Sequence, residues 1–169
     1  MPLQQGAVVW RIAQRRHALD RTGAGAREHG GRWNHPGTPV IYAGRSVGIA
    51  ALERFVHLAG LAPPDLVLVR IELPEGCSTE TPERAALPSG WNAVPGGPAS
   101  MDFGTAWARA GRSLVLHVPS ALVPEEGNAV LNPRHPEFAA VRLSIARPFS
   151  FDPRMYESRT ALARPRRRG

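Results

Sequence analysis

An acidic and a basic side chain lie one helical turn apart in the stretch VIYAGRSVGIAALERFVH, which runs from Val40 to His57. Glu53 and His57 are four positions apart, so on a helix they are separated by about 40° around the axis. Such a pair is either an exposed charge pair worth roughly a few tenths of a kcal/mol, or the carboxylate and partner of an active site. The helix alone favours the exposed pair, and the decision depends on the neighbouring residues.

Two residues that precede this helix could act on the same cleft. Arg32 follows two glycines in the segment GGRWN, where close backbone approach is possible and a guanidinium could grip a phosphate or a carboxylate. Tyr42 ends a predicted strand just before the helix, where its ring could cover the cleft. Taken singly, each has an ordinary alternative, as a surface arginine or a core-edge aromatic.

Ser120, in HVPSAL, is a third candidate, because it ends a predicted strand and could project from a sheet rim. It could equally be the N-cap of a short turn. Ser120 is not in a G-x-S-x-G turn, and Cys77 lies in a loop without an evident base, so a nucleophilic triad is not supported.

Metal chemistry and lysine chemistry are not expected. The six histidines include no pair resembling H-E-x-x-H, and the single cysteine lacks the partners of a Cys-rich zinc site. The sequence contains no lysine, which excludes a P-loop lysine and a Schiff base. We therefore expect no metal site.

Length, composition and charge limit the class of protein. A chain of 169 residues with 43% hydrophobic residues can form one domain with a real core. All 21 basic residues are arginine and the net charge is +7, but no reading helix or aromatic platform accompanies the charge, so direct nucleic-acid binding is not expected. An acidic protein partner or a phosphate-bearing small molecule fits better. No segment has signal-peptide or membrane-spanning length, so we expect a cytoplasmic protein without membrane contact.

The elements that must position these residues come in an irregular order. Strands are predicted over residues 7–12, 39–43, 66–73 and 113–119, with one or two more within 136–151. Helices are predicted over 47–59, with Ser46 as N-cap and Gly60 as stop, and over 103–110, ended by Gly111. Residues 15–34 and 74–100 are expected to be mostly irregular. This order favours a compact single α+β domain with mixed or antiparallel sheets and short helices over a doubly wound sheet.

Together these positions resemble the RES-domain toxins of bacterial RES–Xre toxin–antitoxin pairs. The family is named for an arginine, a glutamate and a serine, which here are Arg32, Glu53 and Ser120. They lie in the motifs GGRWN, VIYAGRSVGIAALERFVH and LVLHVPSALVPEEGNAVLNPRHPEF, and LPSGW, FGTAW and FDPRMY agree as well. The third motif also contains Asn128, Asn132 and His135.

The sequence departs from the family pattern at two places. Gly44 stands where a hydroxyl residue is expected, and Ser46 could take over its contact. The arginine-rich tail has no assigned family role. We therefore expect one RES domain over residues 7–156, followed by a tail over 157–169 without fixed structure.

The resemblance implies a fold similar to ADP-ribosyltransferase toxins, with NAD as substrate and no prosthetic group. Family members either degrade NAD by hydrolysis or phosphorolysis, or transfer ADP-ribose to a protein. The implied partner is a helical, Xre-like, DNA-binding antitoxin that covers the active site in a hetero-oligomer, so DNA would be contacted only through the antitoxin. The remaining alternative is an inactive binding module, which would show salt-sensitive binding and no NAD turnover.

The resemblance also implies roles for individual residues. The catalytic residues would be Arg32, Tyr42 and Glu53. Glu53 would stabilise an oxocarbenium-like ribose, Arg32 would bind the diphosphate, and Tyr42 would stack on the nicotinamide. Other residues would contact NAD or its pocket: Trp33 as a wall, His57 as the residue that orients Glu53, and Ser46, Ser120 and Asn132 as polar contacts.

Overall fold

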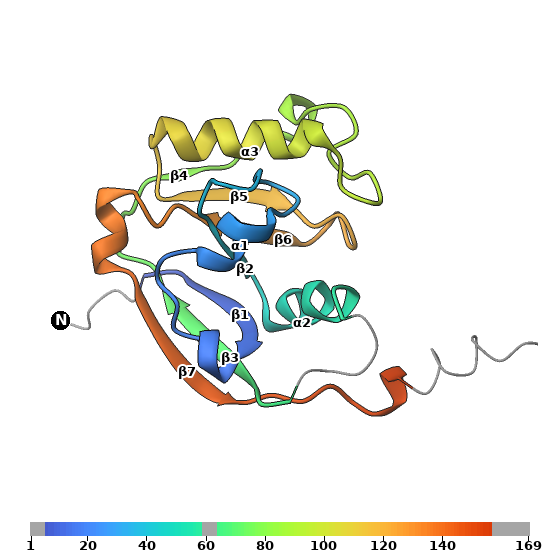
Figure 1. The fold of residues 1–169 in the computed structure, drawn as a ribbon. Helices are drawn as coiled ribbons and strands as arrows, with labels where there is room; N and C mark the ends of the chain where they lie inside the picture. Colours follow the sequence, from blue (N-terminus) through green and yellow to red (C-terminus); the bar gives the residue numbers. More distant parts are fainter. Residues whose placement is uncertain (1–5, 59–63, 157–169) are drawn as a thin grey trace, which may run out of the picture.

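The computed structural model describes residues 6–58 and 64–156 (Figure 1). These residues contain seven strands: β1 (Val8–Gln14), β2 (Ile41–Gly44), β3 (Leu66–Glu72), β4 (Thr79–Glu80), β5 (Val115–Pro119), β6 (Gly127–Leu131) and β7 (Arg142–Pro148). The described α-helices are α1 (Ala24–His29), α2 (Val47–Val56) and α3 (Pro98–Ala110). Short 3-10 helices are η1 (Arg15–His17), η2 (Arg84–Ala86) and η3 (Pro136–Ala140).

The strands form one mixed sheet in the order β4-β5-β6-β2-β1-β3-β7. β4 and β5 run parallel, and the other neighbouring pairs are antiparallel. β1 pairs with β3 along its whole length, from Val8 to Gln14, but with β2 only where Trp10 faces Gly44. The sheet therefore has two halves that join at this pair. Figure 1 shows α3 lying along the half that contains β5 and β6, while α2 contacts β1 and β2 at the junction.

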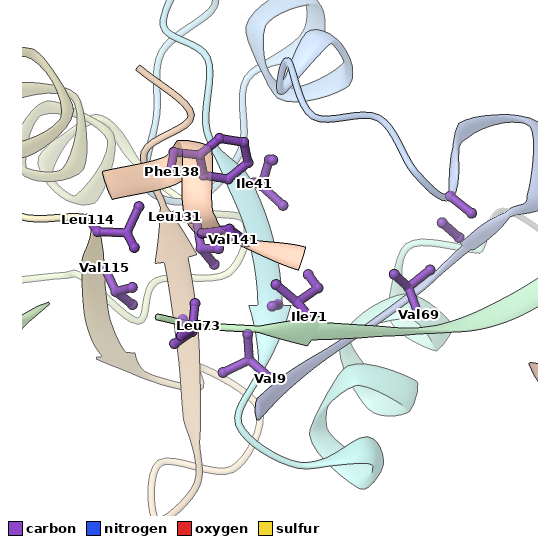
Figure 2. Close-up of a cluster of buried hydrophobic side chains, with 14 of the residues drawn as sticks. Val9, Ile41, Val69, Ile71, Leu73, Leu114, Val115, Leu131, Phe138 and Val141 are labelled. Atoms are coloured by element: carbon purple, nitrogen blue, oxygen red, sulfur yellow. The ribbon is translucent and has the colours of Figure 1, made fainter. Parts of the chain in front are cut away.

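The largest group of buried apolar side chains joins the two halves of the sheet. Figure 2 shows Val9, Ile71 and Leu131 from strands of both halves together with Phe138 of η3. β3 is buried at successive positions from Leu66 to Val69, as expected for a strand that is covered on both faces. Burial of this apolar surface is the main driving force for folding.

Two further apolar groups attach the helices to the sheet. Under α3, the rings of Trp33, Trp91 and Trp107 pack with Leu116 and Val130. Beside α2, partly buried side chains such as Phe55 pack against the buried residues of the third group: Ile12, Leu58, Leu66, Leu68 and Phe151.

The predicted single α+β domain is confirmed, and so is the N-cap of α2. Ser46 Oγ accepts a hydrogen bond from the main-chain N–H of Ile49 at 3.1 Å, which fixes where the helix begins. α2 ends at Val56 rather than Ala59, because its last turn tightens through a bond from Leu58 N–H to the carbonyl of Phe55. The predicted stop at Gly60 lies outside the described residues.

α3 is longer than predicted at its N-terminus. It begins at Pro98 instead of residue 103, because proline suits the first turn of a helix, where its missing N–H has no partner to lose. Its predicted end is confirmed, since Gly111 adopts a left-handed conformation with φ of 60°.

Several short elements were not predicted. β6 begins with Gly127 and Asn128, which are poor strand formers, and it exists because it pairs with β2 on one side and with β5 on the other. β4 and η2 lie in the segment expected to be irregular, and η1 and α1 lie within residues 15–34. The arginine-rich tail predicted from residue 157 onward lies outside the described residues. Among the described helices, none has the length and apolarity needed to cross a bilayer.

Candidate active site

The position of Glu53 depends on the close packing of α2 against β2. A Cβ atom at Gly44 would lie 2.6 Å from the amide nitrogen of Ala50, so only glycine lets the helix approach the strand this closely. Gly44, which departs from the family pattern, therefore has a packing role here. α2 then presents the partly exposed Glu53 toward β6 and the β5–β6 hairpin.

The carboxylate of Glu53 is held by two donors on one oxygen. Ser120 Oγ donates to Oε1 at 2.9 Å, and Asn128 Nδ2 donates to the same oxygen at 2.6 Å. Hydrogen bonds to a charged acceptor are stronger than bonds between neutral groups, so together they fix the orientation of the carboxylate. No donor among residues 6–58 and 64–156 bonds to Oε2, which leaves this oxygen available to a ligand.

Ser120 combines the two roles that the sequence left open. Its side chain is fully buried just beyond β5, and Oγ also accepts from the main-chain N–H groups of Leu122 and Val123. The same hydroxyl therefore closes the turn after β5 and donates to Glu53.

Asn128 belongs to the third motif, and the sequence alone indicates no role for it. Its register opposite Gly44 on β2 and Val118 on β5 brings its amide to the Glu53 carboxylate. The missing signal was β6 itself, since without this strand the side to which Asn128 points could not be inferred.

His57 does not contact the Glu53 carboxylate, the group that it was predicted to orient. His57 Nδ1 bonds the main-chain oxygen of Glu53 at 2.7 Å, and the ring is exposed at the end of α2. The ring thus satisfies a carbonyl of the last helical turn, while Ser120 and Asn128 hold the carboxylate.

Tyr42 holds the loop that carries Arg32. The Tyr42 hydroxyl donates to Asn34 Oδ1 at 2.7 Å and accepts from Trp33 N–H at 2.9 Å. Gly31 allows this contact, because a Cβ atom there would lie 2.7 Å from the hydroxyl oxygen. Burial raises the pKa of Tyr42 well above its ordinary value, so the group stays a neutral donor.

Arg32 fastens its own loop to the segment before α3. Its Nη1 donates to the carbonyls of Trp91 at 2.9 Å and Ala93 at 2.8 Å. The guanidinium is partly exposed and makes no other side-chain hydrogen bond to the described residues. Its remaining N–H groups are the candidate donors to a phosphate or carboxylate.

Trp33 and Asn132 do not lie where the sequence prediction put them. The Trp33 side chain is 2% exposed, with its ring stacked on Trp91 and edge-on to Phe103, so it supports the core instead of walling a pocket. Asn132 is 2% exposed and follows the far end of β6, where its amide bonds Ala108 O and Arg134 N. Both ends of that buried amide are satisfied within the fold, and it makes no hydrogen bond to Glu53.

The structure therefore brings together Glu53, Ser120 and Asn128, with Ser46 capping the helix that carries the glutamate. Separately, it joins Tyr42 to the Arg32 loop. Among the described residues there is no group of three or more His, Cys, Asp or Glu side chains that could hold a metal ion.

The fold and this site define a small α+β protein in which one glutamate of a short helix is oriented by a serine and an asparagine of a neighbouring hairpin. Its family follows from comparison with known sequences. The RES domain matches residues 8–152, and the chain belongs to the RES-domain family, as the motifs predicted.

Two curated relatives are named as toxins. The chain is 43% identical over 152 residues to "Prs ADP-ribosylating toxin" of Sphingobium sp. (strain YBL2), covering 86% of this chain and 94% of the relative. It is 41% identical over 152 residues to "Toxin Res" of Yersinia enterocolitica, covering 88% and 99%. The chain is thus a member of a family of toxins.

A solved structure shows the same fold. The M. tuberculosis MbcT–MbcA toxin–antitoxin complex contains a chain that matches with a TM-score of 0.62 and 21% sequence identity, over 91% of this chain and 88% of that one. At this identity, the likeness shows the fold alone.

Proposed function

We propose that this chain is a toxin that cleaves the nicotinamide–ribose bond of NAD and so depletes it. The observation that carries the proposal is the Glu53 carboxylate, whose Oε1 is held by Ser120 and Asn128 while Oε2 has no donor among the described residues. An oriented carboxylate with one free oxygen suits a reaction in which positive charge develops on a sugar.

The chemistry requires little besides orientation and charge. Nicotinamide leaves NAD as a neutral molecule, taking the electron pair of the broken bond, so no general acid is needed. The ribose carbon gains positive charge, and Glu53 Oε2 would stabilise it or accept a hydrogen bond from the 2′-hydroxyl. An oxygen of water or phosphate then bonds to the ribose carbon and loses its proton. The free N–H groups of Arg32 suit the diphosphate.

Tyr42 fits this proposal differently from the stacking role suggested by the motif. Its hydroxyl keeps the Arg32 loop in place through Trp33 and Asn34, which makes it a positioning residue for Arg32.

A second candidate is transfer of ADP-ribose to a protein. It is favoured by the 43% identity to a relative named "Prs ADP-ribosylating toxin". The bond that breaks is the same in both reactions, and only the acceptor differs.

The partner in this proposal is a helical, Xre-like antitoxin that covers the Glu53 site in a hetero-oligomer and contacts DNA itself. Support comes from a chain of the same fold in a toxin–antitoxin complex. A cytoplasmic location belongs to the proposal as well, because the substrate is NAD.

The test is to incubate the purified, antitoxin-free chain with NAD, with and without phosphate, and to follow nicotinamide and its co-product by mass spectrometry. The Glu53→Gln variant should fold and lose turnover, because it keeps the shape of the side chain but not its charge. Glu75→Gln is the matched control, since Glu75 is exposed and makes no side-chain hydrogen bond or ion pair to the described residues.

Each outcome has a clear meaning. Free ADP-ribose identifies water as acceptor, and ADP-ribose 1-phosphate identifies phosphate. A protein that carries added ADP-ribose after exposure of a cell extract supports the second candidate. Nicotinamide release at an unchanged rate in folded Glu53→Gln would remove the glutamate from the mechanism.

A further inference from the structure

A cleft opens at the end of the β5–β6 hairpin, beside the segment that follows β4. It has a volume of about 230 Å³, and Glu53 is not among its lining residues. Its charged and titratable lining residues are Arg45, Arg84, His117, Glu125 and Glu126. The volume exceeds that of one water molecule, about 30 Å³ in the liquid, several-fold, so the cleft has room for a small polyatomic ion.

Arg45 is fixed across the hairpin end. Its main-chain N–H donates to the carbonyl of Gly127 at 3.0 Å. A Cβ atom at Gly127 would lie 2.8 Å from Arg45 Cδ, so the glycine lets the arginine stem lie against the strand. Arg45 makes no ion pair within the described part of the chain, and its guanidinium keeps its hydrogen-bond donors for a ligand.

Arg84 reaches the same cleft from η2. One of its terminal nitrogens, Nη2, donates to the carbonyl of Pro124 at 2.5 Å, which holds the guanidinium at the hairpin turn. Within residues 6–58 and 64–156 it has no carboxylate partner. Two guanidinium groups from separate elements therefore meet in one cleft without a compensating ion pair.

His117 adds a third group. Its Nδ1 is buried and has no hydrogen-bond partner within the described residues, and the ring lines the cleft. Burial, and next the charge of Arg45, lower the pKa of His117, so the ring is neutral near pH 7. The tautomer protonated at Nε2 avoids an unpaired buried N–H and makes the ring a hydrogen-bond donor.

The two glutamates do not cancel this arrangement. Glu125 and Glu126 lie in the hairpin turn with exposed side chains, and neither forms an ion pair with any described residue. The two arginines are exposed as well, but Arg84 is held by the hydrogen bond of its guanidinium and Arg45 by its packed stem, whereas neither carboxylate is held by a side-chain contact to the described residues. The groups held in the cleft are therefore all donors.

We propose that this cleft binds a phosphate-class anion, held by Arg45, Arg84 and His117. Two guanidinium groups and a neutral imidazole N–H match the oxygens of a phosphate group. The site is distinct from the Glu53 site: His117 pairs with Ala129, the residue after Asn128, and successive strand residues point to opposite faces. The side chains of His117 and Asn128 therefore point to opposite faces of the hairpin, and neither Glu53, Ser120 nor Asn128 lines the cleft.

The source of the phosphate group is either free inorganic phosphate or the ester of a larger molecule. Calorimetric titration of the full chain with inorganic phosphate and with ribose 5-phosphate, at constant ionic strength, separates these two sources. Tighter binding of phosphate assigns the free ion, and tighter binding of the ester assigns a phosphorylated ligand.

Variants locate the binding. Arg45→Gln and Arg84→Gln should each weaken it by about tenfold or more, because each removes charge-assisted hydrogen bonds. Arg27→Gln is the matched control for general charge, since Arg27 is exposed on α1 and makes no side-chain bond to described residues. Arg32→Gln tests whether the anion binds instead at the proposed substrate site, and it should leave in place the binding that depends on Arg45 and Arg84. If Arg45→Gln does not fold, the phosphate affinity of Arg84→Gln tests the proposal by itself.

Three results would overturn the proposal: no binding of either anion, equal weakening in Arg27→Gln, or loss in Arg32→Gln with Arg45→Gln unaffected. The second result would mean diffuse attraction to a basic surface, and the third would place the anion at the substrate site. None of these measurements depends on NAD turnover, so failure of this proposal and failure of the proposed function can be told apart.

Discussion

Ser120 Oγ donates a hydrogen bond to Glu53 Oε1 over 2.9 Å, joining two residues that are 67 positions apart in the chain. Asn128 Nδ2 donates to the same oxygen at 2.6 Å. The glutamate is therefore oriented from the β5–β6 hairpin rather than from its own helix. Under the proposed function, its reactive oxygen is Oε2.

The first prediction concerns the Asn128 amide. Asn128→Ala removes one of the two donors to Oε1, so the carboxylate can rotate, and kcat for NAD cleavage should fall by about 10-fold to 100-fold. KM should change little, because the asparagine does not contact substrate in this proposal. Initial rates of nicotinamide release over a range of NAD concentrations separate the two parameters.

Asn128→Asp supplies the control. It keeps the size of the side chain but faces Glu53 with a second carboxylate, so its kcat should be lower than that of Asn128→Ala. Equal turnover in the wild type and in both variants would show that the orientation of Glu53 does not matter.

The second prediction concerns His57, whose ring bonds the main-chain oxygen of Glu53 instead of its carboxylate. His57→Ala should keep kcat within about twofold of the wild type and cost only about 0.5–1 kcal/mol of stability at the helix end. Nicotinamide release and urea unfolding measure the two effects. A loss of turnover as large as that of Asn128→Ala would show that His57 contributes to NAD cleavage.

The third prediction concerns the Tyr42 hydroxyl. Tyr42→Phe leaves Trp33 N–H and Asn34 Oδ1 without their partner, so the free energy of unfolding should fall by about 1–3 kcal/mol. The loop that carries Arg32 should loosen, so KM for NAD should rise. Urea unfolding followed by tryptophan fluorescence gives the stability, and an unchanged midpoint would contradict the structural role of the hydroxyl.

Local patterns in the sequence predicted most of the framework and only part of the site. Ser46 as N-cap and Gly111 as C-cap follow from residue type and position within one helical turn, which is why both predictions are confirmed. The strand β6 has no such local signal, since its Gly127 and Asn128 favour turns. It is stabilised by β2 and β5, which are distant in sequence.

Because β6 was not predicted, the sequence could not tell which of two asparagines lies beside Glu53. Asn128 and Asn132 both belong to the third motif, and they are about 13 Å apart along an extended chain. Only the register of β6 shows that Asn128 lies beside Glu53, while Asn132 lies beyond the other end of the strand. Trp33 is a similar case, because its type and position do not distinguish a pocket wall from a buried ring.

The fourth prediction concerns Gly104 of α3. An added Cβ would lie 2.0 Å from the main-chain oxygen of Trp33, so Gly104→Ala must push α3 away from that loop. The loss of stability should be about 1–3 kcal/mol or more, despite the higher helix propensity of alanine.

Gly25→Ala is the matched control, since Gly25 is also helical and has open space around its Cβ position. It should gain about 0.5–1 kcal/mol, and similar urea midpoints for both variants would contradict the close packing.

The last prediction is the pH dependence of a stabilising contact between η3 and the segment before β4. Glu137 Oε2 accepts from Ser78 Oγ at 2.6 Å and from Ser78 N–H at 2.9 Å. These two hydrogen bonds lower the pKa of Glu137 below its ordinary value, and the bond from the Ser78 hydroxyl has the larger effect. Because the folded pKa is lower than the unfolded one, the carboxylate stabilises the fold fully above the unfolded pKa of about 4.3, and this contribution is lost as the pH falls through the folded pKa.

Glu137→Gln should therefore unfold at lower urea than the wild type at pH 7, and the difference in midpoint should shrink below about pH 4. Other carboxylates titrate in both proteins and cancel in this difference, and Glu75→Gln, at an exposed position, should show no such trend. A difference that stays constant from pH 7 to pH 3 would mean that Ser78 does not distinguish the charged from the neutral side chain.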